Sequence, residues 1–171
     1  RSRRAPPAAD PLAELDARCL AGEAVCERAA DGYALRSLGD QHGRWRYAEL
    51  LYQACRQDRP AACGRLADHY ASGDLAPPPA PAFAAVFERA CGTPLPSDLN
   101  TCMAAALHGL ACQRGHGAGC AGLHAIVSGD GLAFAANLSQ LVRLELDACH
   151  GGHPPSCARA AARFTHADGV P

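Results

Sequence analysis

The chain has 171 residues, of which 49% are hydrophobic and 19% are charged, and its formal net charge is −1 at pH 7. These values are typical of a soluble globular protein and argue against overall disorder and against a surface built to bind nucleic acid. Aromatic residues make up only 5%, and the apolar residues are mostly alanine and leucine. Since β-branched and aromatic residues carry the strand preference, we expect an all-α protein. No run of about 20 apolar residues occurs, so no transmembrane segment is predicted.

The ten cysteines are the strongest compositional feature, because they form five close pairs separated by 7, 8, 11, 8 and 8 positions. Structural zinc sites usually contain Cys-x2-4-Cys knuckles, and redox-active sites usually contain Cys-x-x-Cys; no Cys-x-x-Cys occurs here. The spacing therefore favours structural disulfides, which indicate an oxidising compartment: a periplasm, a cell surface or another exported location. The predicted disulfide residues are Cys19, Cys26, Cys55, Cys63, Cys91, Cys102, Cys112, Cys120, Cys149 and Cys157.

The N-terminal stretch RSRRAPPAADP is basic and proline-rich, so residues 1–10 are predicted to be a flexible tether to a membrane or a complex. Because the chain begins at Arg1 without a methionine or an apolar signal core, we expect a mature or trimmed product. Asp10 is a good N-cap and Pro11 suits the first helical position, so the first helical hairpin is expected at about residues 11–38.

The second hairpin is predicted at about residues 45–73. Its second helix has apolar residues at i, i+3, i+4, i+7 and i+8 from Cys63, which is a helical core stripe, and Gly73 ends it. The first helix is expected to begin near Trp45, Arg46 and Tyr47, residue types that dominate interface energetics. These three residues are candidate partner-binding residues, and the alternative is that Trp45 packs against the preceding hairpin. The stripe consists of Cys63, Leu66, Ala67, Tyr70 and Ala71.

The rest of the chain is predicted to form hairpins at about 81–112 and 98–129, which share one helix, and at 138–166, followed by a tail at 167–171. Ser97 or Asp98 can cap the shared helix, which then serves two cysteine pairs. Cys91 follows Cys55 by 36 positions, and Cys149 follows Cys112 by 37. A helix-turn-helix period near 36 is typical of a solenoid, in which each hairpin is stabilised by stacking on its neighbours.

The pattern Tyr52-x-x-Cys55, followed by Cys63-x-x-Leu66-Ala67-x-x-Tyr70-x-x-Gly73, resembles the Sel1-like repeat. The cysteines at both ends of the turn resemble the disulfide-rich subgroup typified by the Helicobacter cysteine-rich proteins. The likeness covers roughly residues 12 to 166 and implies a right-handed α-solenoid. In a helical hairpin the end of one helix lies beside the start of the next, within the distance that a disulfide requires. We therefore expect local pairing, namely 19 with 26, 55 with 63, 91 with 102, 112 with 120 and 149 with 157.

Other motifs are assigned to the fold. The run Gly117 to Gly122 matches G-x-G-x-x-G, but a predicted helix precedes it, so its glycines are interpreted as a hairpin turn. Five histidines, at 108, 116, 124, 150 and 153, could hold a transition metal or haem, but we interpret them as polar turn and surface positions. All sixteen basic residues are arginine, and without lysine the Ser-x-x-Lys chemistry of serine β-lactamases is impossible.

No enzymatic activity, metal or cofactor is therefore predicted. The resemblance to Sel1-like proteins implies a non-enzymatic scaffold that binds a protein or peptide along a concave face. The alternatives are a redox or metallo-cofactor assembly factor and a structural subunit of a larger complex, which could be respiratory or membrane-associated.

Overall fold

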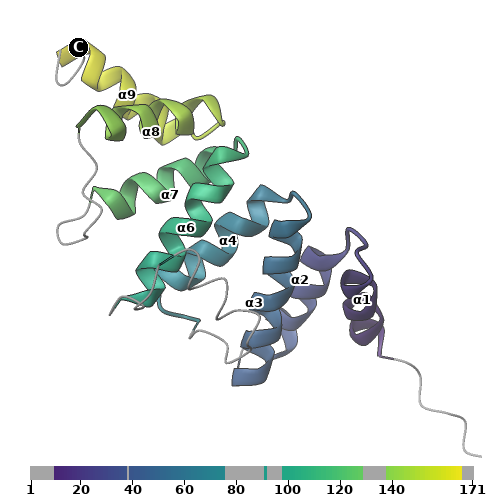
Figure 1. Ribbon diagram of the computed structural model, residues 1–171. Helices are drawn as coiled ribbons and strands as arrows, with labels where there is room; N and C mark the ends of the chain where they lie inside the picture. Colours follow the sequence, from purple (N-terminus) through teal and green to yellow (C-terminus); the bar gives the residue numbers. More distant parts are fainter. Residues whose placement is uncertain (1–9, 38, 76–90, 92–97, 129–137, 167–171) are drawn as a thin grey trace, which may run out of the picture. The chain divides into compact units, whose positions relative to one another are not determined.

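The structure is a computed structural model that describes residues 10–37, 39–75, 91, 98–128 and 138–166. Within these residues the chain forms eight α-helices and no strand, so the all-α prediction is confirmed (Figure 1). None of the described helices is long and apolar enough to cross a membrane. The helices are α1 (Pro11–Leu20), α2 (Cys26–Ser37), α3 (Gln41–Arg56), α4 (Pro60–Ala71), α6 (Leu99–Gln113), α7 (Gly117–Val127), α8 (Leu138–His150) and α9 (Pro154–His166).

The chain divides into two compact units, Arg1–Gln57 (unit 1) and Asp58–Pro171 (unit 2). In unit 1, α2 packs against both α1 and α3. In unit 2, each of α4, α6, α7 and α8 packs against the next described helix, and α4 also contacts α7. The boundary lies between α3 and α4, inside the hairpin predicted at residues 45–73. Stacking of all hairpins into one solenoid stays a prediction, as do the other hairpin boundaries that fall on undescribed residues.

Aspartate caps decide where several helices begin. The Asp10 side chain accepts a hydrogen bond from Leu12 N, and the Asp98 side chain accepts one from Thr101 N, as the sequence predicted. The prediction for α3 is wrong by four residues: Asp40 accepts a hydrogen bond from Gly43 N at 2.8 Å, so the helix already begins at Gln41. A side-chain acceptor at the N-cap satisfies an N–H that the helix leaves unpaired, which outweighs the helix-weakening Gly43.

Several helices are followed by a turn that contains a residue with positive φ. After α8, Gly152 has a φ of +84°, Gly152 N donates to Cys149 O at 3.0 Å, and His153 N donates to Ala148 O at 2.9 Å. This is a Schellman end, in which a left-handed residue reverses the chain. Asp58, after α3, is a non-glycine residue in the same region, with a φ of +63°. The pattern Cys-x-x-(Gly or Asp)-x-(Pro or Gly)-x-x-Cys thus recurs at residues 55–63, 112–120 and 149–157.

Disulfides close several of the turns. The structure pairs 19 with 26, 91 with 102, 112 with 120 and 149 with 157, and the Cα atoms of each pair are 4.7, 5.9, 4.5 and 4.5 Å apart, respectively. Four of the five predicted pairs are therefore confirmed, and α6 carries one cysteine of each of two pairs. Cys55 and Cys63 are also disulfide-bonded. Their pairing with each other stays a prediction.

The core is built from leucine, alanine and a few large side chains. In unit 2, Leu66 and Tyr70 are each 1% exposed and Met103 is 2% exposed. Full burial of a side chain such as leucine contributes about 1.5–3 kcal/mol. The predicted stripe on α4 is confirmed from Cys63 to Tyr70, but Ala71 is exposed because the helix ends there.

The glycine run at residues 117–122 lies inside α7, so its interpretation as a turn is wrong. The glycines instead let α6 and α7 approach closely. A Cβ on Gly119 would lie 2.5 Å from the Ala111 Cβ, and one on Gly122 would lie 2.4 Å from the His108 ring. The predicted helix before Cys91, the cap at Ser97 and the two chain ends lie outside the described residues.

Candidate functional site

Unit 2 contains an open cleft of about 590 Å³, which we call the α6–α8 cleft. It is bounded by the C-terminal part of α6, by the turn into α7 and by one face of α8. Drug-sized ligands occupy sites of this size. Its lining residues are Gly109, Cys112, Gln113, Gly115, Leu123, Leu144, Asp147, His150 and Gly151.

Helical spacing explains which residues face the cleft. On α8, Leu144 and Asp147 lie at i and i+3 and therefore share one face of the helix, and Gly151 follows in the turn after it. Leu123 of α7 and Leu144 are half-buried and supply the apolar surface, whereas Asp147 is exposed. The arrangement is an apolar floor with a polar rim.

A close contact between glycines holds one end of the cleft. Gly117 N donates to Gly151 O at 3.2 Å, which joins the start of α7 to the end of α8. A Cβ on Gly117 would lie 2.5 Å from Ala148 O, so no side chain fits there. The disulfides at 112–120 and 149–157 fix the two turns beside this contact.

A buried carboxylate links α8 to its two neighbouring helices. The Glu145 side chain is 1% exposed, and Arg163 Nε of α9 lies 2.7 Å from Glu145 Oε2. Arg159 Nε lies 3.7 Å from Glu145 Oε1. His124 Nε2 of α7 lies 3.2 Å from the same oxygen but forms no hydrogen bond with it. A buried charge is tolerated when it is paired in this way. This cluster therefore holds α8, the helix that carries Leu144 and Asp147, against α7 and α9.

His108 is a second buried polar residue, and its interpretation as a turn or surface position is wrong. It lies within α6, is 3% exposed, and its Nδ1 has no hydrogen-bond partner among the described residues. His108 Nε2 lies 3.4 Å from Asp68 Oδ1 of α4. Burial lowers the pKa of His108; Asp68 raises it to a lesser extent, and the nearby His116 lowers it further. Burial also lowers the pKa of His124, despite the adjacent Glu145.

No family model, curated protein or solved structure matches the chain. Membership of the Sel1-like repeat family therefore stays a prediction. Among the described residues, no three His, Cys, Asp or Glu side chains are grouped so that they could hold a metal ion.

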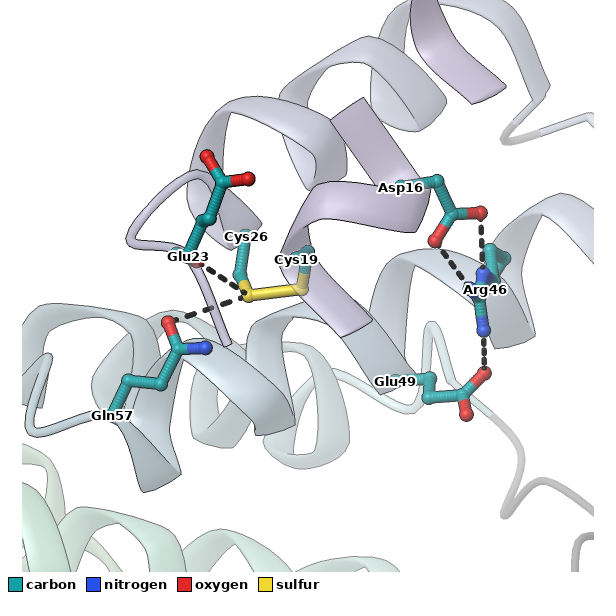
Figure 2. The surroundings of a disulfide bond; sticks show 7 residues. All are labelled: Asp16, Cys19, Glu23, Cys26, Arg46, Glu49 and Gln57. Atoms are coloured by element: carbon teal, nitrogen blue, oxygen red, sulfur yellow. Dashed lines mark hydrogen bonds and ion pairs between the residues drawn. A yellow bond between two sulfur atoms is a disulfide. The ribbon is translucent and has the colours of Figure 1, made fainter. Parts of the chain in front are cut away.

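The predicted partner-binding residues Trp45, Arg46 and Tyr47 lie in unit 1, in the first half of α3. Figure 2 shows the Arg46 guanidinium between Asp16 of α1 and Glu49. Asp16 also accepts a hydrogen bond from Tyr33 of α2 at 3.0 Å, and the hydrogen bond to Asp16 is the main reason why the pKa of Arg46 is raised. This network ties the three helices of unit 1 together.

The network limits what these three residues offer to a partner. Tyr47 is 3% exposed and belongs to the core, and Arg46 is engaged by two carboxylates, whereas Trp45 is half-buried. Partner binding by this segment stays a prediction, with Trp45 as its accessible member. The nearby Cys19–Cys26 disulfide contacts Gln57 Oε1 through Cys26 Sγ at 3.4 Å (Figure 2).

The buried histidines predict a pH dependence of stability. Unfolded His108 and His124 bind a proton at the ordinary pKa of about 6.5, whereas in the fold both bind it only at lower pH. Below about pH 6.5 the unfolded state therefore holds more protons, and the free energy of unfolding falls until the pH is below both folded-state pKa values. Urea unfolding at pH 7.5 and 5.5 measures this loss. The loss should be smaller in H108Q and smallest in H108Q/H124Q, and an equal loss in all three proteins would refute the assignment.

Proposed function

We propose that the chain is a non-enzymatic scaffold that binds an extended peptide segment of a partner protein in the α6–α8 cleft. The observation that carries this proposal is the cleft itself: an apolar floor of Leu123 and Leu144 below a rim of Gln113, Asp147 and His150. Such a surface suits one or two side chains of a peptide, with polar groups left to orient its backbone.

The other reactive side chains of the described residues support the fold and not a reaction. All the described cysteines are in disulfides, and Glu145 is held by arginines of α9. Local disulfides across the turns that follow α1, α6 and α8 support an oxidising, exported compartment such as a periplasm or cell surface. Successive packing of the helices within unit 2 supports a Sel1-like solenoid as the frame that presents the cleft.

The test uses the full chain as bait for a random 12-residue peptide library displayed on phage. Selected peptides are labelled with fluorescein, and their affinity is measured by anisotropy for the wild type and for G109M. Gly109 lies in α6 at the cleft, and among the described residues a Cβ there meets only Leu123 Cδ2 at 3.8 Å, an ordinary contact. The methionine therefore fills the cleft while it raises helix propensity by about 0.8 kcal/mol. We expect binding to weaken at least about tenfold, or 1.4 kcal/mol.

The matched control is A125M, which adds the same side chain at an exposed position of α7 outside the cleft. Its affinity for the selected peptides should equal that of the wild type. Circular dichroism verifies that both variants keep their helix content. Failure to select any peptide, or selection of peptides that bind G109M as tightly as the wild type, would overturn the proposal.

A further inference from the structure

We infer that the α6–α8 cleft selects peptides by a cationic side chain, arginine or lysine, whose charged end binds Asp147. This inference rests on the proposed function and names the chemistry by which the same cleft would choose its partner. It is carried by the charge and the shape of the cleft lining.

The charge of the cleft is unbalanced. Among the described lining residues there is one carboxylate, Asp147, one histidine, His150, and no arginine. Within the described part of the chain, the Asp147 side chain has no hydrogen bond or ion pair. By contrast, Glu145, two positions earlier on α8, is paired with arginine. An exposed carboxylate at the edge of an apolar cleft attracts a cation and repels an anionic ligand.

The shape of the cleft matches the two parts of a long basic side chain. Leu123 of α7 and Leu144 of α8 are half-buried apolar groups, and Leu144 lies one helical turn before Asp147. Lysine and arginine lay their aliphatic stems along apolar surface while they keep the charged end in water. A stem against the two leucines would bring its charged end to the Asp147 carboxylate at the rim.

The nearest alternative is an acidic ligand held by Arg114, the residue before the lining residue Gly115. Arg114 does not line the cleft, and its Nε lies 3.4 Å from Asp58 Oδ1. This arginine is already engaged within unit 2, so the observations favour the cationic ligand.

The experiment compares peptides selected by the wild type with peptides selected by D147N, which keeps the shape of the side chain and removes its charge. We expect arginine or lysine to be enriched at one position by the wild type and not by D147N. Replacing that arginine with the neutral isostere citrulline should weaken binding to the wild type about tenfold and leave binding to D147N nearly unchanged. The control E27Q changes the net charge equally in unit 1 and should bind like the wild type.

The outcomes separate this inference from the function on which it rests. Cleft-dependent peptides without basic enrichment, or with equal affinity for D147N and the wild type, would overturn the inference and leave the scaffold proposal standing. Selection of acidic peptides would also overturn it. An absence of any peptide sensitive to G109M would overturn both.

Discussion

Replacing Arg163 with methionine is expected to lower the free energy of unfolding by about 3 kcal/mol, because it leaves the Glu145 carboxylate buried without its principal partner. Arg163 donates to Glu145 through Nε at 2.7 Å and through Nη2 at 3.3 Å, and the Glu145 side chain is only 1% exposed. Methionine keeps an apolar stem of similar length, so the loss reports the charge and not the packing. Urea unfolding followed by circular dichroism measures the change.

The matched variant is R159M, which removes the more distant arginine. Arg159 Nε lies 3.7 Å from Glu145 Oε1 and its side chain is 46% exposed, so the loss should be under about 1 kcal/mol. The double variant E145L/R163M should recover most of the stability lost by R163M, because an apolar pair can replace a buried ion pair. Equal losses for R163M and R159M would show that Glu145 does not depend on its closest partner.

Reduction of the disulfides is expected to unfold the chain at neutral pH without denaturant. By the chain-entropy relation, closing a loop of about eight residues contributes about 2.5 kcal/mol, and the four described pairs together contribute on the order of 10 kcal/mol if they are additive. This sum is comparable with the whole net stability of a typical domain, about 5–15 kcal/mol. Circular dichroism at 222 nm with and without a phosphine reductant measures the loss of helix.

A single pair provides the graded control. The variant C149A/C157A opens one turn and should lose about 2.5 kcal/mol while it remains folded. Peptide mapping of the unreduced protein verifies which cysteines are joined, including Cys55 and Cys63. Retention of a cooperative helical fold after complete thiol labelling would contradict the structural role of the disulfides, and cross-links between different hairpins would contradict local pairing.

The local features of the fold were predictable because short-range chemistry decides them. Asp10 and Asp98 cap their helices through the next few backbone N–H groups, and the cysteine spacing places both sulfurs at one turn. The error in the predicted start of α3 also has a local cause. Asp40 lies among glycines that are typical of a turn, yet it caps a helix that contains Gly43.

The cleft and the buried polar residues depend on contacts between helices, which spacing does not reveal. Glu145 lies in the sequence RLELD and looks like a solvent-exposed residue until Arg163, eighteen positions later, is placed beside it. His108 is buried because Gly122 leaves room for its ring. The sequence alone does not show which side chain will pack against a glycine within a helix. Asp147 and Leu144 were missed for the same reason, since only the packing of α8 on α7 assigns them to a common surface.

The turn that recurs at residues 112–120 and 149–157 also bears on how the chain acquires its covalent structure. Ten cysteines can pair in on the order of a thousand ways, and most of these pairings would trap a misfolded chain. A loop of about eight residues closes far faster than a long one, and the left-handed residue in each turn already directs the second cysteine back toward the first. These two pairs can therefore oxidise as soon as their own turns form, before the rest of the chain has folded, and their correct oxidation does not depend on the order in which the hairpins meet.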